Sequence, residues 1–363
     1  MLTMAVLVAV PLLCGACGAP SFSSEMRKKM EKVVADVMSS ENVPGVIVGV
    51  WVPGKGTWIE AKGKADVKTG RAIEEGDGVR IASNTKPFTA TVILQLVDEG
   101  KLSLDDKPEK FVQGVPHGNE ITIRQVCNMT SGIFSFTEDE QFDKEFTENP
   151  LMALTPQQEV DIALKHEPYF PPGQGWHYSD TNYEILGMII EKVTGNKAGE
   201  EITRRIIEPL GLKNTSFPVT PDIAGKHSNG YVYMDGKGLV DYTRLNPDIP
   251  WTGGAIVSSL SDMKIWAKAL AEGKLLSKKM FAEQIDWVDT GAGATKYGLG
   301  VMNVDGFIGH HGAIFGFNSV FLYYPEEEAT IVVFANQSTN SSNEAADIFI
   351  GLLKVIFPEE IPK

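Results

Sequence analysis

Residues 81–90 read IASNTKPFTA and mark the point where a β-type pattern gives way to a helical one. Pro87 would clash with the carbonyl group four residues earlier if a helix extended far upstream, so we expect the helix to start close to Ser83. Upstream, GVIVGVWV and TWIEAKGKADV flank PGKG at 53–56 and predict the two strands of a hairpin. The stretch therefore separates a strand-rich beginning from a helical middle.

Strand patterns return after residue 250, at GLGVMNV, FIGHHG, FNSVFLYY and TIVVFAN, and Asp305-Gly306 is a strong hairpin signal between the first two. Helical spacing precedes the first strands and follows the last ones. These patterns predict one α/β (α+β) fold, in which an antiparallel sheet is built from both chain ends and flanked by terminal helices. We expect residues 20–363 to form a single domain, with sheet-containing parts at about 20–85 and 250–363 and an inserted helical part at about 86–249.

The composition excludes several classes of function. With 363 residues, of which 43% are apolar and 22% charged, the chain can bury a sizeable core. Its net charge of −14 disfavours nucleic acid and anionic lipid as partners, because both require a positive surface. The 6 histidines include no HExxH motif and no Cys/His cluster at ligand spacing, so we expect no metal and no cofactor.

Residues 1–19 are typical of a leader, because an uncharged apolar run ends in small residues. The sequence LCGAC resembles a bacterial lipobox in which Cys17 would be acylated, and cleavage after Ala19 is the competing outcome. No Lys or Arg precedes the apolar run, so an internal start or a buried first helix also stays open. We expect export to the periplasm or cell surface, with membrane contact only through a lipid anchor. Either cleavage leaves Cys127 without an internal partner.

Ser83 lies three residues before Lys86, on one face of the expected helix. At a helix N-terminus the free amides and the positive dipole end favour an oxyanion, which suits a serine that attacks a carbonyl group. Lys86 could then act as the base if burial favours its neutral form. A plain helix cap followed by a solvated lysine is the competing interpretation. The same spacing recurs in SLSDMKIW, where we interpret Ser261 as an N-cap and Lys264 as solvated.

Two further motifs accompany this pair. The chain carries Ser83-Asn84-Thr85-Lys86, then Tyr178-Ser179-Asp180, then His310-His311-Gly312. In order, spacing and flanking sequence they resemble the SxxK, YxN and K/HxG motifs of the serine β-lactamase and penicillin-binding-protein-like hydrolases, in the branch that holds class C β-lactamases, D-alanyl-D-alanine carboxypeptidases and β-lactamase-like esterases. The resemblance covers nearly all of residues 25–350.

The resemblance implies a β-lactamase/transpeptidase-like fold with Ser83 as nucleophile and with Lys86 and Tyr178 as proton carriers. It also implies an oxyanion hole made by the amides of Ser83 and Ala313. A lysine ammonium beside Tyr178 would favour a phenolate base, although Tyr178 could instead be an aromatic packing anchor.

The third motif lies on an expected strand. His310 and Gly312 border the site there, and Gly312 allows close approach of the backbone. A structural role for His310 stays open. His311 points to the opposite face and is expected to be structural.

Two departures from the family pattern bear on the substrate. Asp180 replaces the asparagine of YxN; it keeps an acceptor for Lys86 but loses an amide donor, and it could instead cap the following helix. If Asp180 faces the site, its charge favours the ammonium form of Lys86 and repels anionic substrates. His310 stands where class C β-lactamases offer a permanent cation. No GxSxG is present, so the α/β-hydrolase route is not supported.

The sequence thus predicts a serine hydrolase that forms an acyl-enzyme on an amide or ester carbonyl. A D-alanyl-D-alanine carboxypeptidase acting on cell-wall peptide comes first. A carboxylesterase for small esters comes second and is favoured by Asp180. A penicillin- or peptide-binding protein without turnover is the alternative from another class.

Overall fold

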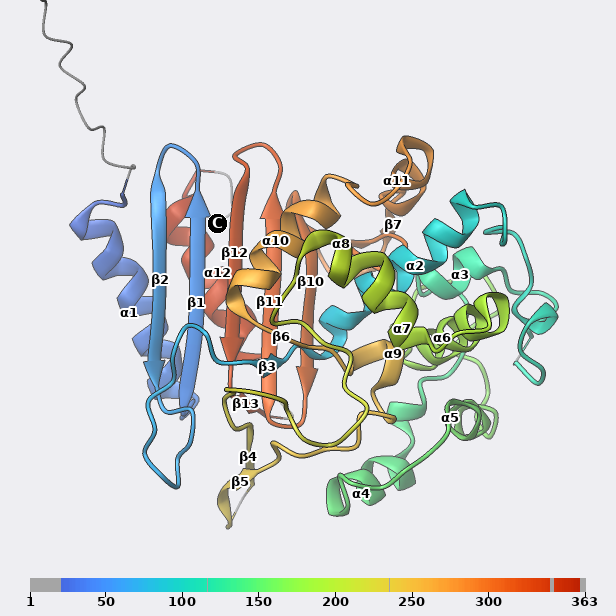
Figure 1. The fold of residues 1–363 in the computed structure, drawn as a ribbon, viewed down its shortest axis with the longest axis horizontal. Coiled ribbons are helices and arrows are strands. Elements are labelled where there is room, and N and C mark those ends of the chain that lie inside the picture. Colours follow the sequence, from blue (N-terminus) through green and yellow to red (C-terminus); the bar gives the residue numbers. More distant parts are fainter. Residues whose placement is uncertain (1–20, 116, 235, 340–342, 360–363) are drawn as a thin grey trace, which may run out of the picture.

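The computed structural model describes residues 21–115, 117–234, 236–339 and 343–359, so the leader and Cys17 lie outside the described residues. An antiparallel sheet dominates the fold, with strand order β2-β1-β12-β11-β10-β9-β8-β7 (Figure 1). Its strands are β1 (Gly45–Val52), β2 (Gly56–Gly63), β7 (Val288–Asp289), β8 (Thr295–Tyr297), β9 (Met302–Val304), β10 (Phe307–Ile314), β11 (Phe317–Tyr324) and β12 (Ala329–Ala335). The pairing of β1 with β12 joins the two chain ends, which confirms the expected fold class.

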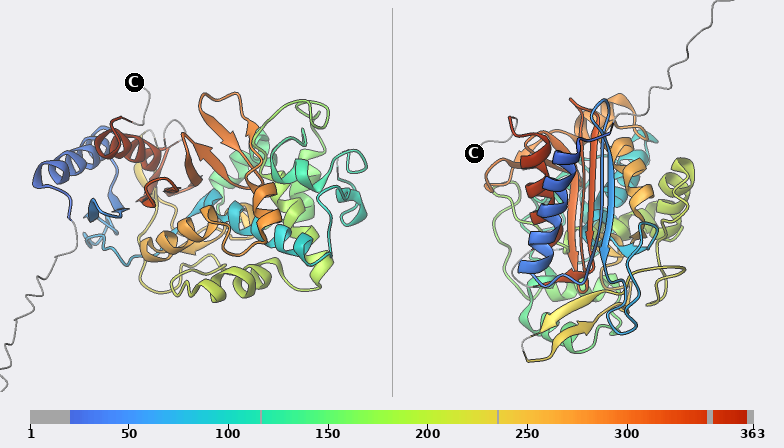
Figure 2. Two further views of the ribbon diagram at one scale, coloured as in Figure 1. Left: turned by 90° about the horizontal axis from the view of Figure 1, so that it is seen from above. Right: turned by 90° about the vertical axis from the view of Figure 1, so that its left-hand side faces the viewer.

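Helices α1 (Ser24–Ser40) and α12 (Glu344–Ile356) cover one face of this sheet, where they lie side by side (Figure 2). Strand alternation directs Val46, Val48 and Val50 into the core beneath them, whereas Ile47 belongs to the core on the other face. Strands β1, β11 and β12 carry mostly apolar side chains on both faces, so they are buried from both sides.

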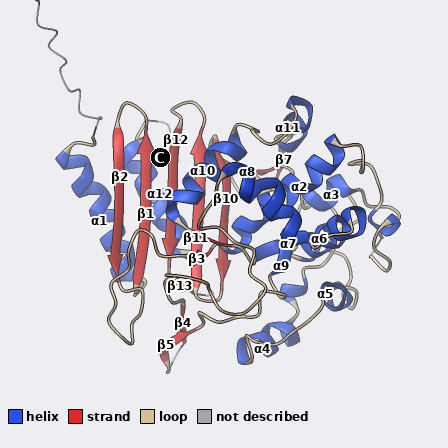
Figure 3. Ribbon diagram, viewed as in Figure 1, coloured by secondary structure: helices blue, strands red, loops and turns tan. Residues whose placement is uncertain are grey.

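The helical region packs against the other face of the sheet (Figure 3). Its helices are α2 (Lys86–Asp98), α3 (Ile123–Cys127), α4 (Glu140–Glu148), α5 (Pro156–Ala163), α6 (Thr181–Thr194), α7 (Ala198–Ile202) and α8 (Glu208–Leu210), with α9 (Trp251–Gly254), α10 (Leu260–Ala271) and α11 (Lys278–Gln284) following. Short strands β4 (Tyr231–Met234), β5 (Gly238–Asp241) and β13 (Gln337–Ser338) form one small sheet, and β3 (Val79–Arg80) pairs with β6 (Val257–Ser258).

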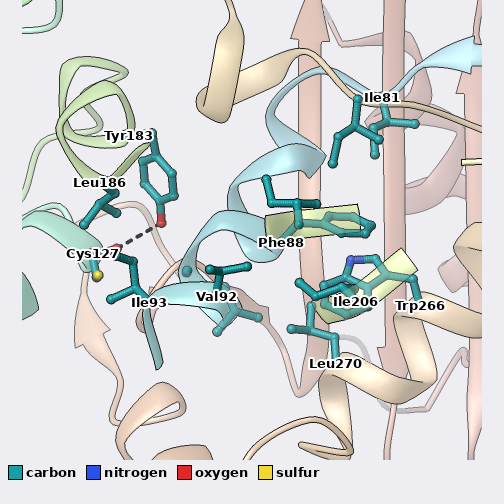
Figure 4. Packing of buried hydrophobic residues seen from close by; sticks show 14 of the residues in the cluster. Ile81, Phe88, Val92, Ile93, Cys127, Tyr183, Leu186, Ile206, Trp266 and Leu270 are labelled. Carbon is teal, nitrogen blue, oxygen red and sulfur yellow. Dashed lines mark hydrogen bonds between the residues drawn. The ribbon is translucent and has the colours of Figure 1, made fainter. Parts of the chain in front are cut away.

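Helix α2 runs through the middle of the core. The ring of Phe88 stacks on Trp266 of α10 with centroids 4.2 Å apart (Figure 4). Cys127 is fully buried nearby, and burial raises the pKa of its thiol to about 12. Its carbonyl accepts a hydrogen bond from the hydroxyl of Tyr183 at 3.2 Å. The element that carries the SxxK motif is therefore fixed by dense packing on several sides.

The interpretation of Ser261 as an N-cap is wrong. Ser259 has the extended backbone of an N-cap, and its Oγ accepts from the amide of Asp262, whereas Ser261 lies within the first turn of α10. The helix begins earlier because Leu260 already belongs to its buried face. Lys264 is exposed, as expected, with its ammonium 4.7 Å from the ring centroid of Trp51. Within the described ranges, no helix is both long and apolar enough to cross a membrane.

Candidate active site

Ser83 lies in a 3-10 turn, Ala82–Thr85, that leads directly into α2, with Pro87 in the first turn of the helix. Helix α2 thus starts close to Ser83, as Pro87 predicts. Ala82, immediately before Ser83, has a positive φ of 51°. A non-glycine residue in this region costs free energy, and such strain recurs where a nucleophile must be held in one orientation. The half-buried side chain of Ser83 opens onto a pocket.

Lys86 is fully buried, and its ammonium group has three acceptors. Nζ donates to Ser83 Oγ at 3.1 Å, to Asp180 Oδ1 at 2.6 Å and to the carbonyl of Gly253 at 3.0 Å. Because a lysine ammonium carries three hydrogens, this set matches the charged form of Lys86. The competing interpretation of Lys86 as a solvated lysine is therefore wrong.

Asp180 faces the site. It is the residue before α6, but its side chain makes no capping bond to that helix. Instead, Oδ1 accepts from Lys86, and Oδ2 accepts from the hydroxyl of Thr137 at 3.0 Å. The amide of Asp180 donates to Ser135 Oγ at 3.0 Å, which fixes the backbone. The loop before α4 therefore holds the carboxylate beside Lys86, a contact that local sequence does not encode.

Tyr178 lies on the other side of Lys86, with the ammonium 4.9 Å from its ring centroid. Burial and the negative charge of Asp180 raise the pKa of Tyr178 well above its usual value, and a contact with the Ser83 hydroxyl opposes this only in part. Burial and the charge of Asp180 thus oppose the phenolate form that a lysine ammonium would favour. The resting site holds a neutral phenol, an ammonium and a carboxylate.

Strand β10 borders the nucleophile. It pairs with β9 only over 307–309, so residues 310–314 extend beyond that partner. A Cβ added to Gly312 would lie 2.8 Å from the backbone nitrogen of Ser83 and 2.6 Å from the carbonyl oxygen of Ile81. The third motif therefore needs glycine, as expected, so that strand and nucleophile can approach closely. Ala313, the next residue, lines the pocket beside Ser83.

His310 is buried behind this strand edge and is not among the described residues that line the pocket. Its Nδ1 faces the carbonyl of His311, so Nδ1 carries the proton and Nε2 accepts from the hydroxyl of Tyr297 at 3.0 Å. Burial, with the charge of Lys86 adding to it, lowers the pKa of His310 well below its ordinary value and keeps the ring neutral.

His311 pairs with Val320, whose side chain packs under the terminal helices, so His311 points to the opposite face as expected. Tyr297 was not singled out by sequence reasoning.

The pocket beside Ser83 has a volume of about 260 Å³. One wall is apolar and is formed by Phe136, Phe142, Phe146, Ile249 and Phe315. Three acidic side chains, Asp143, Asp180 and Glu184, also line it, and no lysine or arginine does so among the described residues. Sequence reasoning missed this wall because its phenylalanines come from separate loops and helices, each of which has only the spacing of a core residue.

The described part of the chain holds no group of three or more His, Cys, Asp or Glu side chains that could bind a metal ion. A serine hydroxyl bonded to Lys86, which in turn bonds Asp180, supplies a nucleophile and a lysine–carboxylate pair that can take up its proton, as a covalent acyl transfer requires.

Known proteins resemble this chain over most of its length. The family model described as Beta-lactamase matches residues 30–354. A D-stereospecific amidohydrolase from Streptomyces sp. is 32% identical with a TM-score of 0.81, and the match covers 91% of this chain and 98% of that one. An octameric penicillin-binding protein homologue from Pyrococcus abyssi is 26% identical with a TM-score of 0.76, covering 93% and 79%.

Among curated relatives, PbpX of Bacillus subtilis is 29% identical over 267 residues, which is 72% of this chain. The chain spans 62% of PbpX and 64% of the protein flp of Staphylococcus aureus, less than two thirds of either. The family match, in contrast, runs from the first helix to the last. The chain therefore belongs to the beta-lactamase family of serine hydrolases.

Proposed function

We propose that this protein hydrolyses peptide-type amides through an acyl-enzyme on Ser83. Ser83 Oγ attacks the carbonyl carbon while its proton passes to Lys86 Nζ, which in turn passes one of its own protons to Asp180 Oδ1. The amides of Ser83 and Ala313 stabilise the oxyanion. The neutral phenol of Tyr178 protonates the leaving nitrogen and is reprotonated from the Lys86–Asp180 pair. Water then attacks the acyl carbon, the same groups carry its proton, and Ser83 is regenerated.

The pocket beside Ser83 is the observation that carries the choice of substrate. Its aromatic wall favours an apolar side chain on the acyl residue, and its acidic side chains favour a positive charge, such as a free α-ammonium group. Similarity to an amidohydrolase described as D-stereospecific supports an amide substrate. The preferred substrate class is thus an amino acid amide or short peptide with an apolar, free N-terminal residue.

D-alanyl-D-alanine carboxypeptidase activity is the second candidate, supported by similarity to a penicillin-binding protein homologue. Such a substrate ends in a carboxylate next to the scissile bond. The described pocket lining offers that carboxylate no cation and places Asp180 nearby. Because of this electrostatic repulsion, we rank the carboxypeptidase activity and β-lactam hydrolysis below hydrolysis of amides that have an apolar, free N-terminal residue.

One panel of substrates tests the proposal. Rates are compared for D- and L-phenylalanine p-nitroanilide, a D-Ala-D-Ala peptide, a short p-nitrophenyl ester and a cephalosporin, with a fluorescent penicillin as label. We expect a phenylalanine anilide to give the highest kcat/KM. Fastest release from the ester would indicate the carboxylesterase, fastest release from the peptide would indicate the carboxypeptidase, and lasting penicillin label without turnover would indicate a binding protein.

Two serine variants serve as controls for this panel. Ser83→Ala should abolish hydrolysis and labelling. Ser261→Ala, which changes the serine with the same spacing to a lysine, should leave both unchanged. Hydrolysis that survives Ser83→Ala would contradict the proposal.

We further infer export from the apolar leader, with a lipid anchor at Cys17 as the specific form. The mass of the N-terminal peptide after expression in a bacterium tests this. An acylated Cys17 supports the anchor, an N-terminus after Ala19 supports simple cleavage, and a retained Met1 contradicts export by this leader.

A further inference from the structure

Two glutamates lie beneath the candidate active site, and neither forms an ion pair with a basic side chain of the described residues within 4 Å. Glu159 of α5 is 0% exposed and Glu184 of α6 is 1% exposed, and the two helices pack against each other. No donor in the described residues reaches either carboxyl oxygen of Glu159 or Oε2 of Glu184. Glu201, which is equally buried, is instead held by the guanidinium groups of Arg204 and Arg205. The first two carboxyl groups therefore need another explanation.

The two carboxyl groups lie within reach of each other, so the charge on each affects the other. Two buried carboxylates in contact cannot both be charged, because burial and like charge both oppose the second ionisation. Burial, with Glu184 adding to it, raises the pKa of Glu159 well above its ordinary value. Burial likewise raises the pKa of Glu184 well above its ordinary value, and the contact with Glu159 and the charge of Lys86 oppose that rise only in part. Because Glu184 is the carboxyl group that borders Lys86, the ammonium charge favours ionisation of Glu184 and leaves the shared proton on Glu159.

Glu184 also faces the catalytic lysine. The position of a Cβ on Gly253 would be 3.4 Å from Lys86 Nζ and 3.6 Å from Glu184 Oε1, so both groups border the gap that this glycine leaves. Glu184 lines the pocket as well. Its charge is therefore close enough to act on the ammonium group of Lys86, whereas Glu159 is not among the described residues that line the pocket.

We propose that Glu159 and Glu184 share one proton beneath Lys86, and that the charge left on Glu184 stabilises the ammonium form of Lys86. Both are positioning residues that act through Lys86. The inference rests on the proposed use of Lys86 with Asp180 in activating Ser83. Glu184 adds a second, buried negative charge beside the ion pair that Lys86 forms with Asp180.

Other ionisable groups face this assembly from the surrounding elements. They are Asp180 before α6, Asp248 before α9, Tyr178, Tyr183 of α6, Tyr297 of β8 and His310 of β10, whereas His311 lies on the opposite face of the sheet. The tyrosines and His310 stay neutral at physiological pH because burial shifts each pKa away from neutrality. Asp180 and Asp248 are the other negative charges, and neither changes in the variants below.

The test measures how fast a fluorophosphonate probe labels Ser83 between pH 5 and pH 9, which needs no substrate. Glu184→Gln removes the charge, Glu159→Gln keeps a hydrogen-bond donor toward Glu184, and Glu159→Leu removes that donor. We expect the labelling rate to fall on the acid side of its pH profile, and we call this fall the acid limb. Glu184→Gln should move the acid limb to lower pH by about one unit. Glu159→Leu should give the same shift, because Glu184 then keeps the proton itself. Glu159→Gln should match the wild-type profile.

Glu191→Gln, on the exposed side of α6, is the matched control and should not shift the limb. An unchanged limb in Glu184→Gln, or equal profiles for the two Glu159 variants, would overturn the proposal.

If Glu159→Leu does not fold, infrared absorption of a protonated carboxyl group at pH 8 gives an independent result. We expect that band in the wild type and its loss in Glu159→Gln; a wild type without the band also overturns the proposal. Failure of the proposed function would appear separately, as absence of Ser83 labelling in the wild type.

Discussion

Lys86 donates to Asp180 over 2.6 Å, and the lysine is fully buried while the carboxylate keeps 27% of its surface exposed. The pair is thus neutral overall, and one of its members stays in contact with water, which limits the desolvation cost. An asparagine at this position would leave only the proposed buried charge of Glu184 to balance Lys86. The ion pair therefore fixes the resting charge of the site and the substrates that it accepts.

The first prediction concerns Asp180→Asn. Removing the carboxylate should weaken binding of a cationic acyl residue and relieve the repulsion of anionic substrates. We expect kcat/KM for phenylalanine anilide to fall, and that for a cephalosporin to rise, by about tenfold each. Asp143→Asn is the control, because Asp143 also lines the pocket but is not one of the three acceptors of Lys86. Parallel losses on both substrates would show that Asp180 does not set specificity.

The second prediction concerns Gly312→Ala. The added methyl group would lie 2.6 Å from the Ile81 carbonyl oxygen and 2.8 Å from the Ser83 nitrogen, so the strand or the nucleophile must move. We expect kcat to fall by about 10²–10³, the effect of losing one oxyanion donor. His311→Ala, on the exposed opposite face, should retain activity. Thermal unfolding of both variants separates this loss from a loss of stability.

The third prediction concerns the aromatic wall. The ring of Phe146 lies between those of Phe142 and Phe315, with centroids 5.6 Å and 5.1 Å away. Phe146→Ala should lower kcat/KM for phenylalanine anilide by roughly 10–200-fold, the range for lost apolar contact in a pocket. Alanine anilide should change much less. Equal losses on the two substrates would contradict a role in side-chain selection, and Leu151→Ala, on an exposed loop, serves as the surface control.

The fourth prediction links Glu159 to the pH dependence of stability. Its pKa is raised in the folded protein by burial, whereas the unfolded chain releases this proton above pH about 4.3. The stability that Glu159 contributes is therefore full below that pH and is lost as pH rises toward the folded pKa. Glu159→Gln does not titrate, so we expect it to gain stability relative to the wild type between pH 5 and pH 8. Urea unfolding across that range measures the difference, and a constant difference would refute the assignment.

The sequence by itself determined the local features of the site and the fold class. The SxxK spacing placed Ser83 and Lys86 on one helical face, and Pro87 restricted where that helix begins. Strand alternation placed His311 on the face opposite Gly312, and the Asp305-Gly306 turn joined β9 to β10. These features depend on neighbours within a few residues, whose periodicity and turn chemistry are present in the sequence itself.

Tertiary structure decided the rest. Whether Asp180 caps α6 or faces Lys86 depends on Thr137 and Ser135, which lie more than 40 residues away in the chain. The neutral state of Tyr178 and the contact between Glu159 and Glu184 likewise follow from burial beside charges on other helices. Burial and contact between distant segments change which charges a group experiences, and those charges set the chemistry. Local pattern therefore identified the nucleophile, whereas the packing of the helical region against the sheet determined its electrostatic environment.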